Sequence, residues 1–238
     1  MTKKNENIYF RSIKYIEEKK QCNTEYNTEE YIYSSLKQNW FFYFIIVVSC
    51  LLISFKTYNS FLSNIFTIVF VSLIGYIVHI ISHNINSKQL YKNSKLKNLH
   101  DNNILNTVIL SICDFIDFHD IVHHNTKINK ELYNIILEFI NNFMMQGGIL
   151  ILIIFIFRNL SIPMILFWAF VYTTTHNINY LIYYTPQVHK NHHKNKHSSY
   201  GIDIWDIMFN TKYDYNEIEQ HNHMSINMLI FVIFLYLL

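Results

Sequence analysis

The sequence predicts an all-α membrane protein, with about four transmembrane helices arranged as two hairpins beneath a histidine-rich cytoplasmic cap. Three observations lead to this fold class. Four long apolar runs alternate with polar segments, lysine and arginine are scarce in the short turns, and thirteen histidines gather beside the runs. Of the 238 residues, 51% are hydrophobic and only 15% are charged, whereas about a quarter are charged in typical soluble domains.

The first 39 residues are polar and basic. No apolar core follows the first charges, so we expect no secretory signal peptide. Within this segment we predict a helix over residues 28–38. Asn27 would be its N-cap, and Glu30, three residues later, would complete a capping box. The helix leads into Trp40-Phe41-Phe42-Tyr43, an aromatic group typical of a membrane surface.

Each of the four apolar runs is close to the roughly 17–25 residues that a helix needs to cross a bilayer. The third run follows Glu138, and the fourth opens with Pro163. Two connections, residues 56–60 and 158–161, are too short to be anything but turns, which predicts two hairpins. The runs cover residues 40–55, 61–82, 139–157 and 162–184.

The positive charges orient the predicted helices. Lys56 and Arg158 are the only lysine and arginine in the two turns. Because cytoplasmic loops carry an excess of these residues, we expect the other polar segments to face the cytoplasm from the endoplasmic reticulum or an equivalent intracellular membrane. A soluble core is the alternative explanation for apolar runs, but four runs with this charge asymmetry favour a membrane. The cytoplasmic segments would be residues 1–39, 83–138 and 185–238.

We divide the chain into three parts. The apolar tail is too short to span a bilayer, so we expect it in the interface or against the helix bundle. The net charge of +2 is too small to indicate a nucleic-acid partner. The parts are a polar N-terminal cytoplasmic segment, residues 1–39, a membrane domain, residues 40–225, and the apolar tail, residues 226–238.

Nine of the thirteen histidines form four clusters at the cytoplasmic ends of the predicted helices. Spacings of three or four residues place the members of a cluster on one helix face. The last cluster follows Pro186, which favours a helix start. Taken singly, each cluster could be hydrogen-bonded or solvated histidines, but together they suit two metal ions with about four imidazoles each. The candidate metal ligands are His79, His83, His119, His123, His124, His176, His189, His192 and His193.

The ligand types favour iron. Neutral imidazole binds iron readily, whereas structural zinc sites commonly use cysteine, and the three cysteines here are scattered without a Cys-x-x-Cys pair. Ligating histidines need their second ring nitrogen held by a carboxylate, carbonyl or water. Four aspartates lie near the clusters, Asp117, Asp120, Asp203 and Asp206, and we favour Asp120 and Asp206 for this role.

The order of these motifs resembles the fatty acid hydroxylase/sterol desaturase superfamily, whose members are membrane-bound, non-haem di-iron enzymes. The resemblance covers roughly residues 61–212. Its most specific part is the series His189-x-x-His192-His193, Tyr200-Gly201 and Trp205-Asp206-x-x-Phe209-x-Thr211.

The chain departs from the superfamily pattern at several positions. Asn210 stands where the superfamily has glycine, and the first motif lacks the arginine often found after its first histidine. In the middle motif, Asp120 occupies a position where the superfamily has histidine, and His119 precedes it. Either His119 takes over the ligand role, or Asp120 supplies a carboxylate ligand or a hydrogen-bond acceptor.

The resemblance implies an oxygenase. In the superfamily, two irons bind and cleave O₂, and the resulting oxidant removes hydrogen from a C–H bond of a fatty acyl or sterol lipid. The motifs do not name the substrate or separate hydroxylation from desaturation. Electrons would come from a separate NAD(P)H-linked donor, a cytochrome b5-type carrier or a reductase, because the four glycines form no nucleotide-binding motif.

Two other classes of function remain open. Histidines and helices also build metal-ion transporters, although these place their ligands near the middle of the membrane. A non-catalytic homologue that acts as a membrane scaffold would explain the changed middle motif and Asn210.

Overall fold

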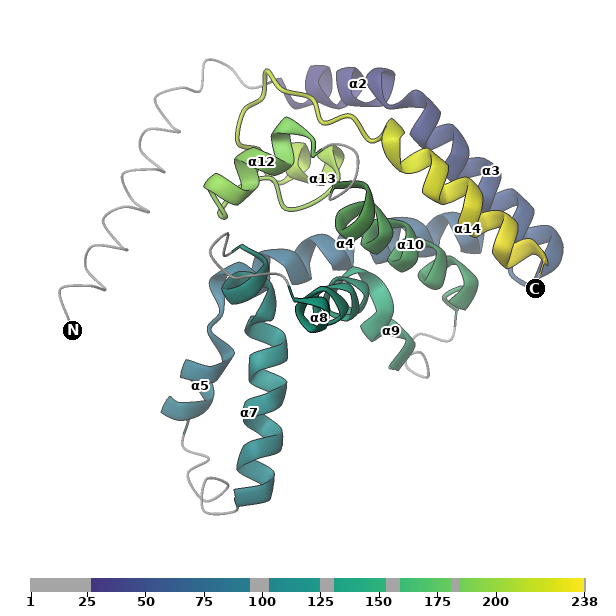
Figure 1. Cartoon of the computed structure of the whole chain (residues 1–238). Helices are drawn as coiled ribbons and strands as arrows, with labels where there is room; N and C mark the ends of the chain where they lie inside the picture. Colours follow the sequence, from purple (N-terminus) through teal and green to yellow (C-terminus); the bar gives the residue numbers. More distant parts are fainter. Residues whose placement is uncertain (1–26, 95–102, 125–130, 153–158, 181–184, 238) are drawn as a thin grey trace.

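The computed structural model describes residues 27–94, 103–124, 131–152, 159–180 and 185–237, and every regular element within these ranges is helical (Figure 1). The first described helix, α2 (Thr28–Gln38), has the predicted bounds. The Asn27 side chain accepts a hydrogen bond from the Glu30 N–H at 3.4 Å, so the predicted N-cap is confirmed. Helix α3 (Trp40–Lys56) follows at a bend of 72°.

Two helices are long and apolar enough to cross a membrane. One is α4 (Phe61–Asn84), which covers the second predicted run. The other covers Leu132–Leu152 and consists of α8 (Leu132–Phe143), the π-helical turn η2 (Met144–Gly148) and α9 (Ile149–Leu152). If α2 and α3 are counted as one bent span, there are three such helices in the described part of the chain.

The start of the third predicted run was wrong. The helix begins at Leu132, seven residues before the predicted start at 139, and Glu138 lies inside it. A charged residue at this position was expected to mark the membrane boundary. Glu138 is instead buried and hydrogen-bonded to a histidine, which removes the cost of placing it in an apolar helix. The end of this run, residues 153–157, lies outside the described residues.

The fourth predicted run is divided. Helix α10 (Ile162–Thr174) has Pro163 in its first turn and continues into the π-helical turn η3 (Thr175–Asn179), and residues 181–184 lie outside the described part. A total of four spans therefore stays a prediction. The tail forms α14 (Ser225–Leu237), which packs along α3 and α10 with Met228 and Val232 buried. One of the two placements predicted for the tail, against the bundle, is thus confirmed.

The apolar core lies between α3, α4, α10 and α14. Gly147, in η2, has φ of +126°, a conformation that favours glycine. A Cβ atom at this position would overlap the Val71 side chain of α4, so the glycine lets the broken helix approach α4 closely. The fully buried core side chains include Phe42, Val71, Met164, Phe167 and Trp168.

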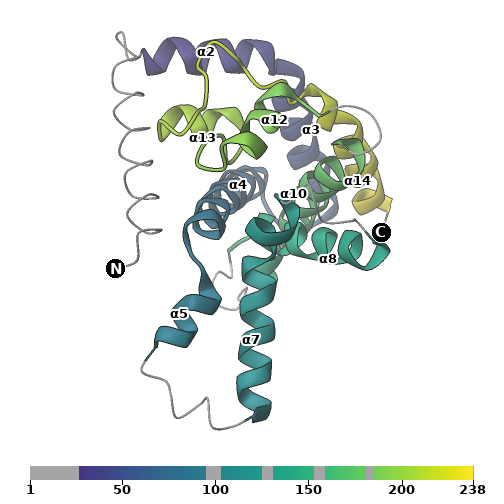
Figure 2. The ribbon, with the colours of Figure 1, turned by 60° about the vertical axis from the view of Figure 1, so that its left-hand side comes forward.

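The segment between the second and third predicted runs is not uniformly polar. It forms α5 (Ser87–Asn93) and α7 (Asn103–Phe118), which project together from the bundle (Figures 1 and 2). The π-helical turn η1 (His119–His123) follows α7 directly. Two short helices, α12 (Gln187–Lys194) and α13 (Asp203–Met208), lie beside α4, where Trp205 of α13 donates to the Ser72 hydroxyl at 3.2 Å. The turn η4 (Asn222–Met224) leads into α14.

Candidate metal centre

The nine candidate histidines meet at one end of the helix bundle. They come from the last turns of α4, from η1 and the residue after it, from η3, and from α12. Two of these elements are π-helical turns, which often occur at functional sites because an extra residue in the turn changes the direction of its side chains. The wider turn of η1 lets His119, His123 and His124 all reach the cluster.

The histidines form two adjoining groups. In the larger group, the ring nitrogens lie within 4.8 Å of one another, a spacing that suits ligands of a shared ion. The smaller group consists of His123, His176 and His189. His193 lies within the same distance of both His123 and His124, so it joins the two groups. The larger group consists of His79, His83, His119, His124 and His192.

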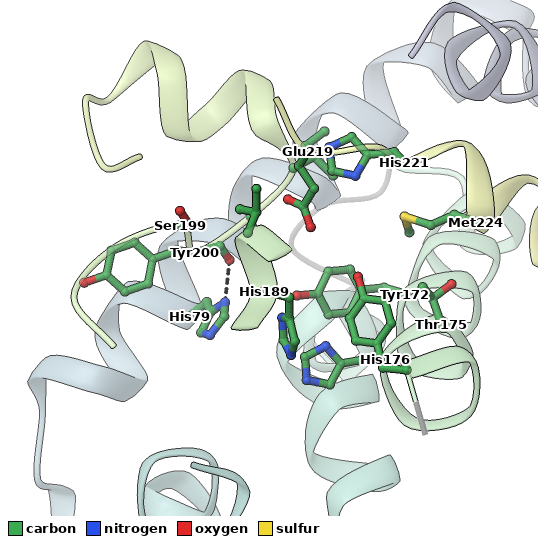
Figure 3. A pocket seen from close by; sticks show the side chains of 14 residues that line it. His79, Tyr172, Thr175, His176, His189, Ser199, Tyr200, Glu219, His221 and Met224 are labelled. Atoms are coloured by element: carbon green, nitrogen blue, oxygen red, sulfur yellow. Dashed lines mark hydrogen bonds between the residues drawn. The ribbon is translucent and has the colours of Figure 1, made fainter. Parts of the chain in front are cut away.

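Four histidines have one ring nitrogen fixed by the protein. The Nδ1 atom of His83 lies 3.1 Å from Asp120 Oδ1, and that of His192 lies 2.6 Å from the Ser198 carbonyl oxygen. The Nδ1 atom of His79 contacts the Tyr200 carbonyl oxygen, as Figure 3 shows. His123 Nδ1 lies 2.7 Å from Glu138 Oε1. This leaves Nε2 for the interior of the cluster, which is the arrangement typical of metal-bound histidine.

Several of the inward nitrogens have no hydrogen-bond partner among the described residues. They are buried, and include Nε2 of His83, Nε2 of His192 and both ring nitrogens of His124. A buried polar atom without a partner costs about 1–3 kcal/mol. A bound metal ion would remove this cost, so the unsatisfied atoms fit a metal site.

Three pairs of Nε2 atoms are in close contact. The separations are 2.9 Å for His79 and His119, 2.9 Å for His123 and His176, and 3.0 Å for His189 and His193. With a metal–nitrogen bond of about 2.1 Å, ligands at right angles lie about 3.0 Å apart and tetrahedral ligands about 3.4 Å apart. The observed separations are therefore close to those of ligands that share one ion.

Burial keeps the cluster uncharged. It lowers the pKa of His119, His189 and His192 well below the usual range, and the neighbouring histidines lower these pKa values further. Only neutral imidazole has a lone pair for a metal ion, so these rings are in the form that binds.

Asp120 is placed to hold a histidine, and His119 is placed among the potential ligands. The Asp120 carboxylate accepts hydrogen bonds from His83 and Lys196. The Lys196 Nζ atom lies 2.7 Å from each of the two carboxylate oxygens. Burial alone would raise the pKa of Asp120, but these two partners outweigh it and lower the pKa to about 2. Asp120 is in none of the potential metal-binding groups found among the described residues.

Asp206 contacts the protein backbone instead of a histidine. Its carboxylate accepts hydrogen bonds from the N–H groups of Tyr200 and Gly201 at 2.8 and 3.0 Å, and from the Thr211 hydroxyl at 2.7 Å. Burial raises the pKa of Asp206 to about 6, although the three hydrogen bonds oppose this rise. Asp206 thus fixes the turn that contains Tyr200, whose carbonyl oxygen contacts His79. The prediction that Asp206 itself contacts a ligating histidine was wrong.

The other two aspartates near the clusters have structural roles. Asp117 accepts hydrogen bonds from the N–H groups of Ser87 and Lys88 at the start of α5. Asp203 forms a buried ion pair with Lys212.

Asn210 adopts a left-handed backbone conformation, with φ of 55°. This region favours glycine, and asparagine is among the few other residues that enter it readily. Asn210 therefore allows the left-handed turn that follows α13.

Two residues at the site were not predicted from the sequence. Glu138 contacts His123 from α8, and Lys196 pairs with Asp120 from the segment after α12. A lone acid in an otherwise apolar helix was the signal for Glu138, because ionisable residues at membrane depth are commonly functional. The sequence contains no comparable signal for Lys196, whose partner is 76 residues away.

A small enclosed pocket lies beside His79, His176 and His189 (Figure 3). Its opposite wall contains Glu219 and His221, and the Glu219 carboxylate points into it. This wall is fixed to the start of α3 by Asn39, whose side chain donates to the Glu219 carbonyl oxygen at 2.8 Å and accepts from the His221 N–H at 2.7 Å. Burial, followed by the charge of Asp203, raises the pKa of Glu219 to about 8.

A larger cleft reaches the other side of the smaller histidine group. It has a volume of about 460 Å³ and lies between α8, η3 and α12. Ile135 of α8 contributes to one wall, and Lys190 and Lys194 of α12 contribute to another. His176 and His189 line the inner end of this cleft.

No family model, curated protein or solved structure matches this chain.

Proposed function

We propose that the protein is a membrane-bound di-iron oxygenase that hydroxylates or desaturates a lipid. The observation that carries the proposal is the pair of adjoining histidine groups, with buried Nε2 atoms turned inward, at the end of membrane-length apolar helices. Two irons bound there would supply the activation of O₂ and the removal of hydrogen from a C–H bond.

In this proposal the chain holds and orients the metal ions. The larger group would hold one ion, and His123, His176, His189 and His193 would hold the other, with His124 near both. Asp120, Glu138 and the carbonyl oxygens of Tyr200 and Ser198 would fix the direction of four rings. Such partners usually change metal affinity by about 10–100-fold when they are removed.

The surroundings support a lipid substrate that approaches from the membrane. The larger cleft is bordered by α8, whose exposed apolar residues Leu132, Ile136 and Ile140 form a stripe at helical spacing. A lipid tail could pass from this surface to the histidines without full exposure to water. We place the histidine end on the cytoplasmic face, and we propose four spans and an external electron donor that docks on that face.

A metal-ion transporter fits the geometry less well. A transporter must release its ion, whereas four of these histidines are each held by a protein oxygen atom, and all nine lie toward the helix ends. The fixed rings favour metal ions that stay bound.

Metal analysis and lipid profiling of the full-length protein would test the proposal. We expect about two irons per chain after purification, and an altered lipid profile in cells that express the chain. The double variant His192→Ala/His193→Ala should lose both the bound iron and the effect on the lipid profile. His197→Ala is a matched control, because His197 lies beside this cluster in sequence but in none of the potential metal-binding groups.

Two results would contradict the proposal. A folded, metal-free protein that leaves the lipid profile unchanged would favour the scaffold. Metal uptake into vesicles that contain the purified protein would favour the transporter.

A further inference from the structure

The pair α5 and α7 forms an arm that leaves the bundle beside the histidine clusters. In Figure 1 and again in Figure 2, α7 runs across the direction of α4, not along it, and points away from the other helices. If α4 crosses the membrane, an arm that leaves its end in this direction runs along the membrane surface.

Helix α7 exposes an apolar stripe that no described residue covers. Val108, Ile112 and Ile116 have exposed fractions of 42–53%. Their spacings of four residues place them on one side of the helix. Such a stripe on a projecting helix predicts a partner surface, because burial of apolar area is favourable by about 25 cal/mol of free energy per Å².

The α5 helix packs on a different side of α7. Ser87 donates from its hydroxyl to Asp117 at 2.7 Å, and the Tyr91 hydroxyl donates to Asn106 at 3.0 Å. At roughly 100° per residue, Asn106 and Asp117 lie roughly opposite Val108 on the helix. Helix α5 therefore leaves the apolar stripe uncovered and supports α7 from the opposite side.

The arm leaves the bundle at the end of α4, one of the helices long and apolar enough to cross a membrane. Lys88 of α5 pairs with Asp114 of α7 at 2.7 Å, and this ion pair lies on the side of α7 away from the stripe. The stripe itself therefore presents only apolar side chains to a partner surface.

We propose that the α5–α7 arm lies in the membrane interface, with the apolar stripe of α7 inserted at the boundary between headgroups and acyl chains. Amphipathic helices bind membranes in this way. The arm would hold the bilayer surface next to η1, which follows α7 directly and carries three of the candidate ligands. The proposal rests on α4 crossing the membrane and is independent of the metal content.

Fluorophores on opposite sides of α7 would test this placement. The full-length chain with Cys22→Ser would carry either Ile112→Cys or, as the control on the polar side, Thr107→Cys, while Cys50 and Cys113 stay buried. Each labelled protein would be reconstituted into vesicles of phosphatidylcholine and phosphatidylserine that contain a lipid with a nitroxide near its headgroup.

We expect the nitroxide lipid to quench the label at position 112 several-fold more than the label at position 107. Equal and weak quenching at both positions would overturn the proposal. Disulfide cross-linking of two chains through Ile112→Cys without quenching would also overturn it and would assign the stripe to a second copy. Iron content, measured in the same preparations, reports separately on the proposed function.

Discussion

The Nδ1 atom of His123 lies 2.7 Å from the Oε1 atom of Glu138, and both side chains are buried. The pair joins η1 to the apolar helix that starts at Leu132. His123 also belongs to the group with His176 and His189 and to the group with His124 and His193. A single carboxylate in an apolar helix thus orients a histidine shared by two potential ligand sets.

Replacement of Glu138 should weaken metal binding without abolishing it. We expect Glu138→Leu to lower the affinity of the smaller group by about 10–100-fold, because His123 loses the partner that fixes its ring. Glu138→Gln keeps an acceptor oxygen and should cause a smaller loss. Competition with a chelator measures these affinities, and Glu131→Gln, at the exposed start of the same helix, is the control. Equal affinities in all three variants would contradict the orienting role.

His119 and Asp120 should have different effects on metal content. His119→Ala removes a potential ligand of the larger group, so we expect the loss of about one of the two ions. Asp120→Asn leaves every histidine in place and removes the charge that contacts His83 and Lys196, so both ions should remain but with weaker binding. Metal analysis before and after dialysis against a chelator separates the two effects. If Asp120→Asn lost one ion outright, Asp120 would be the ligand.

Glu219 should make the protein less stable as the pH rises. Its pKa is about 8 in the folded protein and about 4.5 when unfolded, so the folded state binds the proton more tightly. Stability from this group is therefore present below about pH 4.5 and is lost between about pH 4.5 and 8. Glu219→Gln cannot ionise, so its advantage over the unchanged protein should grow to a few kcal/mol at pH 8.

Thermal unfolding in detergent from pH 5 to pH 8 would measure this difference. Glu29→Gln, on the exposed first turn of α2, should follow the unchanged protein throughout. A constant difference in unfolding temperature between Glu219→Gln and the unchanged protein across this range would show that Glu219 is ionised in the folded state.

Local signals in the sequence were sufficient for several elements. Asn27 and Glu30 predicted the start of α2, because a capping box depends only on neighbouring residues. The uninterrupted apolar run predicted α4. The same reasoning misplaced the start of the third helix, because the partner that makes a buried Glu138 tolerable lies 15 residues away and is visible only in the folded chain.

The candidate site was predictable in its residue types but not in its arrangement. Histidine spacing identified all nine side chains that gather in the two groups. The π-helical turns were not predictable, since the spacing of His119 and His123 also fits an ordinary α-helix. The role of Asp206 was equally hidden, because its partners are the backbone N–H groups of a turn and not a histidine side chain.

The attachment of Asn39 to Glu219 and His221 has a consequence for how the protein matures. These contacts join residues 180 and 182 positions apart, and they complete the wall that closes the pocket beside His79 and His189. During translation, all nine clustered histidines emerge from the ribosome before that wall does. The wall beside the histidines is therefore the last part of this pocket to be synthesised, and contacts with the start of α3 put it in place.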